Sequence, residues 1–246
     1  MITPSISSTT ASIIIPACGD GTRFGADTPK HLIDIGGRPM VQRVIDELPS
    51  YAHIYLLVRP EHAMHTRTMI EAPNLVVVPV HDYRLGVCQT LLNAPVHALN
   101  KTLVVNCDNA ITPPNGWHVF LTKYKNAVVT FIEKERLFPP PFSYVHIAHG
   151  YITEIREKQR IGDHACAGAF LFESYEMLHK LCKWHLALDP PDHNMEHYLA
   201  PVYNRLIMKT NVYNVELNEG DLFVRMGTPS EATEARSYYV SRDQGF

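Results

Sequence analysis

"IIIPACGDGTRFGADTPKHL", residues 13–32, joins an apolar run to a glycine-rich loop that carries Arg23 and Lys30. The apolar run predicts a buried strand over residues 12–16. Glycines have no Cβ atom, so the backbone amides of such a loop can approach an anion closely, and the two cations can neutralise it. Because open α/β sheets bind ligands at the carboxyl ends of their strands, the stretch predicts an α/β fold with a phosphate-binding edge.

Two common phosphate-binding motifs do not describe this loop. A P-loop has a lysine directly after its last glycine, whereas Gly21 is followed by Thr22 and Arg23. A dinucleotide fingerprint has its third glycine three residues after the second, whereas Gly21 and Gly25 are four residues apart. Taken alone, the loop is also compatible with a glycine-rich surface turn, so its meaning depends on the rest of the chain.

The first half of the chain alternates between apolar runs and amphipathic patterns. The apolar runs predict strands over residues 12–16, 53–58, 75–80 and 102–106. The amphipathic patterns predict helices over residues 39–48, 61–72 and 87–99, the last with a start or a kink at Pro95. Continuous apolar strands separated by helices are typical of a parallel sheet that is covered on both faces.

The middle of the chain changes character. Residues 142–158, FSYVHIAHGYITEIREK, predict a β-hairpin with its turn at His149–Gly150. Further patterns predict a strand over 165–174, helices over 175–188 and 195–209, a strand over 212–217 and a helix over 228–239. We therefore expect one α/β domain over residues 12–246, with a mixed, mostly parallel sheet flanked by helices and a small antiparallel extension. Residues 1–11 are expected to form a disordered tail.

Composition and charge narrow the function classes. The 246 residues carry a formal net charge of −3 without a basic stripe, which argues against nucleic acid as a partner. No apolar run approaches membrane-spanning length, and the N-terminus lacks the basic start and apolar stretch of a secretory signal. The five cysteines form no C-x-x-C pair, which favours a reducing, cytoplasmic location. Assembly into a homo-oligomer stays open.

Five ordered blocks, which cover roughly residues 12–236, carry more information than the loop alone. They are G-x-G-T-R-F with its later Pro-Lys and LIDIGGRPMVQRVIDEL, LVVNCDNAI, SYVHIAHGYITEIREK, HACAGAFLF, and the closing pair EHYLAPVYNRLI and GTPSEATEA. The set resembles the signature of the nucleotidyltransferases, which include the sugar-phosphate pyrophosphorylases and their cytidylyltransferase relatives. It is similar to short, dTDP-glucose-pyrophosphorylase-like proteins of capsule and surface-polysaccharide gene sets. The resemblance implies a Rossmann-like nucleotidyltransferase fold.

The resemblance also implies a reaction. In this family a phosphate monoester attacks the α-phosphorus of a nucleoside triphosphate, and pyrophosphate leaves. A phosphate monoester has a second pKa of about 6, so it is largely dianionic near neutrality and needs no general base. What it needs is relief from the repulsion between two anions, together with in-line placement. The family therefore uses amides, cations and Mg²⁺, and Mg²⁺ is the implied cofactor here.

The nucleotide is assigned by resemblance to the first half of the chain. The residues implied to bind it are Ala17, Cys18, Gly19, Asp20, Gly21, Thr22, Arg23, Asn106 and Asp108. The segment YRLGVCQT, residues 83–90, matches the base-reading stretch of the family. Within it, Gly86 and either Gln89 or Thr90 are implied to touch the edge of the base.

Three cations and one carboxylate are implied to act on the phosphates. Arg23 is expected on the β- and γ-phosphates, and Lys30 between the α-phosphate and the incoming phosphate. Asp108 is expected to hold Mg²⁺, and Lys158 to meet the acceptor phosphate. Outside this context, Lys30 would be a solvated surface lysine and Asp108 the cap of a turn.

The acceptor is assigned by resemblance to the second half. The residues implied to face it are Asp108, Glu157, Lys158, Gly168, Glu196 and Arg225. Alternative interpretations remain for three of them: Glu157 and Lys158 would also suit an ion pair at a hairpin end, and Glu196 a charged helix surface.

Arg225 departs from the pattern of the family. Many sugar pyrophosphorylases carry a second metal-binding aspartate at this position, in W-x-D-x-G-T, whereas this chain has LFVRMGTP. A cation cannot bind Mg²⁺. Either the metal uses Asp108 with phosphates and waters, or another acid such as Asp221 substitutes. A third possibility is that Arg225 meets an anionic acceptor.

The leading hypothesis is transfer of a nucleotidyl group from an NTP to a phosphorylated small molecule, a sugar 1-phosphate in the first place. One alternative is a cytidylyltransferase that acts on a non-sugar phosphate or phosphonate. Another is a glycosyltransferase, against which Asp108–Asn109–Ala110 argues because it lacks an Asp-x-Asp motif. The last is a nucleotide-binding domain without catalytic activity. The base and the acceptor are not specified by the sequence.

Overall fold

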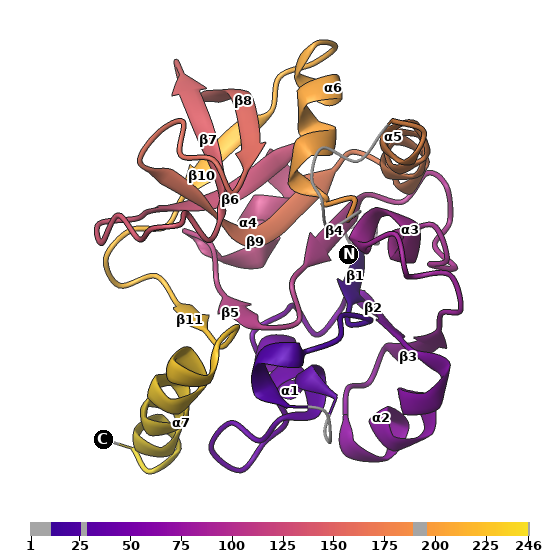
Figure 1. Cartoon of the computed structure of the whole chain (residues 1–246), viewed down its shortest axis with the longest axis vertical. Helices are drawn as coiled ribbons and strands as arrows, with labels where there is room; N and C mark the ends of the chain where they lie inside the picture. The colour runs from indigo at the N-terminus through magenta and orange to yellow at the C-terminus, as the bar shows by residue number, and fades with distance from the viewer. Residues whose placement is uncertain (1–10, 26–28, 189–195, 246) are drawn as a thin grey trace, which may run out of the picture.

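The structure, a computed structural model that describes residues 11–25, 29–188 and 196–245, is built around a nine-stranded mixed sheet (Figure 1). The strand order is β3-β2-β1-β4-β9-β6-β10-β8-β7, and β5 pairs with β11 in a separate ribbon. The strands are β1 Ser12–Pro16, β2 His53–Val58, β3 Leu75–Pro79, β4 Thr102–Val105, β5 Asn109–Ile111, β6 Ala127–Ile132, β7 Ser143–Ala148, β8 Tyr151–Glu157, β9 His164–Phe172, β10 Tyr213–Glu216 and β11 Phe223–Arg225. The helices are α1 Met40–Asp46, α2 Ala63–Met69, α3 Val87–Leu91, α4 Gly116–Lys123, α5 Tyr175–Leu186, α6 Tyr203–Ile207 and α7 Pro229–Asp243. The predicted tail lies outside the described residues except for Ala11.

The first four strands of the order form the parallel sheet that the sequence predicts. β1 is parallel to both β2 and β4, and β2 is parallel to β3. Side chains alternate between the two faces of a strand, so Ile13 and Ile15 pack in a core with α1, α4 and α7, and Ile14 packs in a second core with α3, α5 and α6. All three isoleucines are fully buried, which contributes about 1.5–3 kcal/mol each. The carboxyl ends of β1 and β4 therefore meet at one edge of the sheet.

The antiparallel part of the sheet is larger than the small extension that the sequence predicts. β9 lies between β4 and β6 and is antiparallel to both of them. The predicted hairpin is confirmed as β7 and β8, and its turn residues His149 and Gly150 both have positive φ, 52° and 79°. The hairpin pairs with β9 and β10. The two-residue turn at His149–Gly150 requires β7 and β8 to be antiparallel, and β7 is antiparallel to β9 as well.

Four elements were not predicted, and several predicted helices are shorter than expected. The unpredicted elements are β5, α4, β6 and β11. The helix expected over 87–99 ends at Leu91, and the one expected over 195–209 is reduced in its described part to a 3₁₀ turn at Ala200–Val202 followed by α6. Prolines within both segments remove a backbone donor and prevent a continuous helix. In the described part of the chain, none of the helices combines the length and apolar character that crossing a bilayer requires.

Candidate active site

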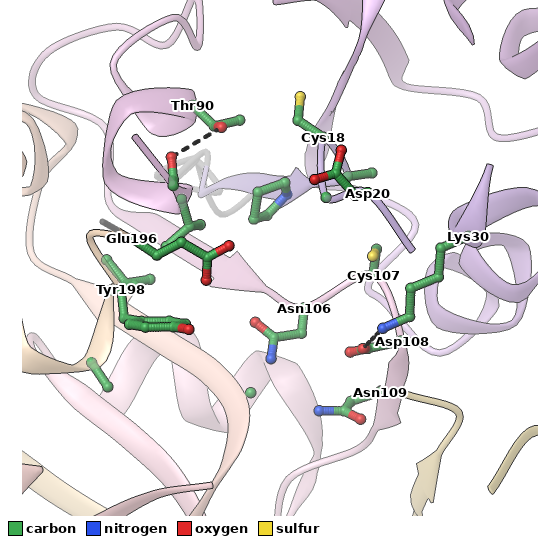
Figure 2. A pocket seen from close by; sticks show the side chains of 18 of the residues that line it. Cys18, Asp20, Lys30, Thr90, Asn106, Cys107, Asp108, Asn109, Glu196 and Tyr198 are labelled. Atoms are coloured by element: carbon green, nitrogen blue, oxygen red, sulfur yellow. Dashed lines mark hydrogen bonds and ion pairs between the residues drawn. The ribbon is translucent and has the colours of Figure 1, made fainter. Parts of the chain in front are cut away.

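A cleft of about 1020 Å³ opens at the carboxyl edge of β1 and β4. Among the residues assigned by resemblance, those that line it are Ala17, Cys18, Gly19, Asp20, Thr22, Arg23, Lys30, Gly86, Thr90, Asn106, Asp108, Glu157, Lys158, Gly168 and Glu196. We call residues 17–25, 30, 83–90 and 106–108 the nucleotide half, and residues 141–143, 157–158, 168 and 196–200 the acceptor half. Figure 2 shows Lys30 and Asp108 facing each other on one side of the cleft, with Glu196 and Tyr198 on the other. Gly21, Gln89 and Arg225 do not line it.

Gly21 acts through its backbone conformation. Its φ of 62° is a value that glycine adopts without strain. A Cβ atom at this position would lie 2.9 Å from the Cβ of Lys30, which is too close for any side chain. Gly21 therefore lets the loop after β1 turn tightly against Lys30, and this explains why it is absent from the surface of the cleft.

Lys30 and Asp108 form the central ion pair of the nucleotide half. Their Nζ and Oδ2 atoms are 2.5 Å apart, and the two side chains are 22% and 19% exposed. Burial disfavours the ammonium form of Lys30, but the Asp108 carboxylate outweighs burial and raises the pKa of Lys30 above its ordinary value. Lys30 is therefore a fixed positive charge that remains open to the cleft.

The cysteines of the cleft are poor nucleophiles. Burial raises the pKa of Cys18 to about 12 and that of Cys107 to about 12. Burial also raises the pKa of Cys166, which lines the acceptor half. A thiolate is the reactive form of cysteine, so these three thiols are protonated and inert near neutral pH. These cysteines are therefore excluded as nucleophiles.

The predicted base-reading segment is held by the chain that follows α5. Gly86 has a φ of 97°, and a Cβ atom there would lie 2.8 Å from the backbone nitrogen of His197. The His197 nitrogen donates to the Leu85 carbonyl at 2.8 Å, and the Cys88 nitrogen donates to the His197 carbonyl at 3.2 Å. The side-chain oxygen of Gln89 accepts from the Leu85 nitrogen at 2.8 Å. The Gln89 side chain is thus used in a hydrogen bond within its own loop. Of the two residues predicted as alternatives for contacting the base, Gln89 and Thr90, it is Thr90 that lines the cleft.

Lys158 anchors the acceptor half. It has a φ of 51°, and its backbone nitrogen donates to the Phe142 carbonyl at 2.8 Å. Its Nζ atom donates to the Tyr198 hydroxyl at 2.7 Å and lies 4.6 Å from the centre of that ring. Next to it, the Ser143 hydroxyl donates to the Glu157 carboxylate. The segments at residues 142–143, 157–158 and 198 therefore meet at Lys158.

Gly168 joins the two halves. A Cβ atom at this position, where φ is 95°, would lie 2.7 Å from Nδ2 of Asn109 and 2.8 Å from Nδ2 of Asn106. The Asn109 amide donates to the Ala167 carbonyl at 3.0 Å, which fixes its orientation. The missing side chain of Gly168 thus makes room for two amides at the floor of the cleft, which Figure 2 shows beside Asp108.

The structure does not bring Arg225 into the cleft. Its guanidinium lies 5.3 Å from the centre of the Phe142 ring, and its Nε atom is 3.3 Å from Oε1 of Glu231. Glu231 belongs to the capping box at the start of α7, together with the predicted cap Thr228. The expectation that Arg225 contacts the acceptor does not match this placement, because the guanidinium pairs with Glu231 and lies over the Phe142 ring without lining the cleft.

One carboxylate of the nucleotide half suits Mg²⁺. In residues 11–25, 29–188 and 196–245, no three histidine, cysteine, aspartate or glutamate side chains gather in a way that could hold a metal ion. Asp221, the substitute considered above, accepts from its own turn at the Asn218 nitrogen, 2.7 Å away, and does not line the cleft. Mg²⁺ is often held by one or two carboxylates together with substrate phosphates, and Asp108 fits that mode of binding.

Several residues that line the cleft were not named as site residues from the sequence. They include His31, Arg59, Phe142, Ser143, Tyr198 and, within the predicted base-reading segment, Tyr83. Arg59 had a usable signal, because it directly follows the predicted strand 53–58 and so had to emerge at the same edge as the loops after β1 and β4. Tyr198 had none, since it reaches the cleft only through the pairing of His197 with the loop before α3.

Comparisons with known proteins agree with this architecture. The family model described as the MobA-like NTP transferase domain matches residues 13–175. The 2-C-methyl-D-erythritol 4-phosphate cytidylyltransferase of Rhodococcus opacus is 28% identical over 104 residues, which are 42% of this chain and 46% of that protein. The bifunctional protein GlmU of Aliarcobacter butzleri is 25% identical over 241 residues, which are 94% of this chain and 54% of that protein. The chain spans about half or less of the length of the curated relatives that it matches.

Solved structures share the fold. The nucleoside-diphosphate-sugar pyrophosphorylase of Vibrio cholerae has a TM-score of 0.78 at 20% identity, covering 92% of this chain and 99% of that one. The UTP-bound UGPase of Acinetobacter baumannii has a TM-score of 0.73 at 16% identity, covering 94% of each chain. The predicted Rossmann-like α/β fold with a mixed sheet is confirmed by these likenesses.

Proposed function

The chain belongs to the MobA-like NTP transferase domain family, and from this we propose that it transfers a nucleotidyl group from an NTP to a phosphorylated small molecule, with release of pyrophosphate. The observation that carries the proposal is the Lys30–Asp108 pair, which lines the nucleotide half of the cleft. It lies beside a glycine-rich loop suited to phosphates, and across the cleft from polar groups suited to an acceptor. A fixed cation of this kind offsets the repulsion between two anions.

The chemistry requires no group of the protein to act as a base. An acceptor phosphate oxygen would attack the α-phosphorus, the bond from the α-phosphorus to the bridging oxygen would break, and pyrophosphate would leave with that electron pair. Lys30 would offset the repulsion between the two anions, since Asp108 raises its pKa and keeps it charged. Arg23, from the same loop, would meet the outer phosphates. The protein thus contributes alignment and charge.

Asp108 would hold Mg²⁺ jointly with the phosphates of the substrate. When bound, Mg²⁺ supplies positive charge that stabilises the leaving pyrophosphate. The chain's own share is the orientation of the Asp108 carboxylate, which stands directly beyond β4 and faces Lys30. A triphosphate that draws Lys30 toward its own oxygens would leave this carboxylate free for the metal.

For the acceptor we propose a sugar 1-phosphate. The Glu157 carboxylate can accept hydrogen bonds from sugar hydroxyls, and the Tyr198 ring offers a flat apolar surface beside it. Lys158 would meet the acceptor phosphate. A second candidate is a cytidylyltransferase with a non-sugar phosphate, which is favoured by the matches to cytidylyltransferases over about two fifths of the chain.

The test is pyrophosphate release. The protein is incubated with Mg²⁺, each of the common NTPs in turn, and a panel of sugar and non-sugar phosphates. We expect one NTP and one acceptor class to release pyrophosphate. Lys30→Ala should lower the rate by about 10²- to 10³-fold or more, as the loss of a transition-state charge contact does. The matched control is Lys180→Ala on α5, where the lysine pairs with Glu176 outside the cleft and its loss should leave the rate unchanged.

Two results would contradict the proposal. If no combination releases pyrophosphate although an NTP binds, the chain is a nucleotide-binding domain without transferase activity. If Lys30→Ala retains most of the rate, the chemistry takes place elsewhere. Comparison of sugar with non-sugar acceptors then decides between the two candidate functions.

A further inference from the structure

We propose that Arg59 is a positioning residue of the nucleotide loop, and that its pairing with Asp20 neutralises a carboxylate that would otherwise repel the triphosphate. The inference rests on the proposed function, because it concerns the same nucleotide half. It adds a residue that the loop motif does not contain and assigns a task to Asp20, an acid in a loop expected to receive phosphates.

Arg59 binds three parts of the nucleotide half at once. Its Nε atom donates to the Cys18 carbonyl at 2.8 Å. Its Nη2 atom forms an ion pair with the Asp20 carboxylate. Its guanidinium lies 4.9 Å from the centre of the Tyr83 ring, which belongs to the loop before α3. A single side chain from the end of β2 therefore ties the glycine-rich loop to the predicted base-reading segment.

The two members of the ion pair differ in how firmly they are held. The Arg59 side chain is 17% exposed, whereas the Asp20 side chain is 72% exposed. Arg59 is fixed by the Cys18 carbonyl and the Tyr83 ring, so it is a rigid support. Among the described residues, Arg59 is the ion-pair partner of the Asp20 carboxylate. The position of the Asp20 side chain therefore depends on Arg59.

The charge of Asp20 explains why the loop needs this support. Asp20 lies between Gly19 and Gly21, in the stretch proposed to wrap the phosphates, and it lines the cleft. A free carboxylate there would repel a triphosphate. Paired with Arg59, the carboxylate is neutralised and also holds the loop in its turn. Removal of Arg59 would therefore weaken nucleotide binding in two ways.

An arginine suits this position better than a lysine. The planar guanidinium donates in two directions at once and packs flat on an aromatic ring, whereas an ammonium is a single point of charge. Arg59→Lys should therefore neutralise Asp20 in part but lose the geometry that includes the Cys18 carbonyl. This variant separates the charge of Arg59 from its shape.

The experiment measures the Kd of the NTP identified above by isothermal titration calorimetry, and kcat and KM for both substrates. Arg59→Ala should raise the Kd of the NTP by about 10- to 100-fold, the usual effect of losing hydrogen bonds to charged groups. The KM of the acceptor should not change. Arg59→Lys should fall between wild type and Arg59→Ala. Asp20→Asn alone should change the Kd by less than about threefold, because Arg59 already neutralises this carboxylate in the wild type.

The decisive variant combines Arg59→Ala with Asp20→Asn. If Arg59 acts by neutralising Asp20, the double variant should bind the NTP at least about threefold more tightly than Arg59→Ala alone, a difference that a merely structural role would not produce. The control is Arg205→Ala on α6, where the guanidinium lies outside the cleft, 5.2 Å from the centre of the Trp184 ring on α5. Its Kd should equal that of wild type.

The outcomes separate this inference from the proposed function. Wild-type protein that binds no NTP overturns the proposed function itself. Wild-type binding with an unchanged Kd in Arg59→Ala overturns the role of Arg59, and a double variant no better than Arg59→Ala overturns the role of charge. Should Arg59→Ala fail to fold by circular dichroism, Arg59→Lys carries the test, and an unchanged Kd in that variant overturns the inference.

Discussion

The nucleotide half of the cleft stands on parallel strands that follow one another in the chain, whereas the acceptor half gathers side chains from three distant segments. In the first, the loop of residues 17–25 lines the cleft together with the part-buried Lys30–Asp108 ion pair and the segment 83–90. In the second, Lys158 is exposed and reaches Tyr198, 40 residues later in the chain. The proposed phosphate chemistry thus depends on the sheet edge, and the proposed acceptor choice depends on side chains that are easily replaced.

The family match covers one half of the cleft completely and the other in part. It spans residues 13–175, which include the whole nucleotide half and residues 141–143, 157–158 and 168 of the acceptor half, but not residues 196–200. A group that must meet a triphosphate is constrained by charge and distance. A group that meets the acceptor is free to vary with the acceptor. We therefore expect variants of the two halves to differ in which kinetic constant they change and in the size of the change.

Besides Lys30→Ala, the largest effect should come from Asp108→Asn in the nucleotide half. Pyrophosphate release should fall by about 10²- to 10³-fold, or about 3–4 kcal/mol in the barrier, because the variant loses the charge that holds Lys30 and the proposed metal. A coupled pyrophosphate assay measures this rate. Asp221→Asn, which alters a turn outside the cleft, is the control. A rate in Asp108→Asn above a third of wild type would remove this residue from the proposed site.

A second prediction concerns the buried support of the nucleotide half. His31 follows Lys30, is 1% exposed, and places its Nε2 atom 2.9 Å from the Thr66 hydroxyl. That hydroxyl already donates to the His62 carbonyl, so His31 must donate from Nε2. Burial, with His62 and His65 nearby, lowers the pKa of His31 to about 4.

The sign of the pH dependence follows from that shift. Between pH 6.5 and 4 the unfolded chain takes up a proton at this histidine that the folded chain does not, so the free energy of unfolding should fall as the pH falls, by roughly 3 kcal/mol in total. Urea denaturation at a series of pH values measures it. His31→Gln should show a flatter profile over this window. Parallel profiles for the two proteins would show that His31 titrates alike in both states.

Some elements of the fold and of the site could be predicted from the sequence, and others could not. β1, β2 and β4 were predictable because each is a continuous apolar run, and the phosphate loop because its glycines and cations are neighbours in the chain. The ribbon of β5 and β11 was not, because strands of three residues show no periodicity.

The direction in which a side chain points could not be predicted from the sequence either. The position of Arg225 was assigned by resemblance, but its direction is set by Glu231 and Phe142, which the sequence does not place beside it. Arg59 likewise gains its role only from tertiary contacts with Cys18, Asp20 and Tyr83. Residues that act through distant partners leave no local pattern.

A smaller effect, confined to the acceptor half, is expected for Lys158→Met. The variant keeps the length of the side chain but loses the charge proposed to meet the acceptor phosphate. Because this lysine is exposed, the KM of the acceptor should rise by only about tenfold, while the KM of the NTP stays within about twofold of wild type. Initial-rate kinetics with each substrate varied in turn measure both constants, and Lys180→Met is the control. An equal rise in both constants would mean that the two halves do not act separately.

The smallest effect should come from Arg225→Ala. The Arg225 side chain is 27% exposed and its Glu231 partner 18%, so loss of the ion pair and of the contact with Phe142 should lower the free energy of unfolding by about 1 kcal/mol or less. Both KM values should stay within about twofold of wild type, since the guanidinium does not line the cleft. Urea denaturation and initial-rate kinetics test the two statements. A rise of tenfold or more in the KM of the acceptor would mean that Arg225 turns toward the substrate when it binds. The acceptor half would then contain a second cation, and an acceptor with an anionic group besides its phosphate would become the better hypothesis.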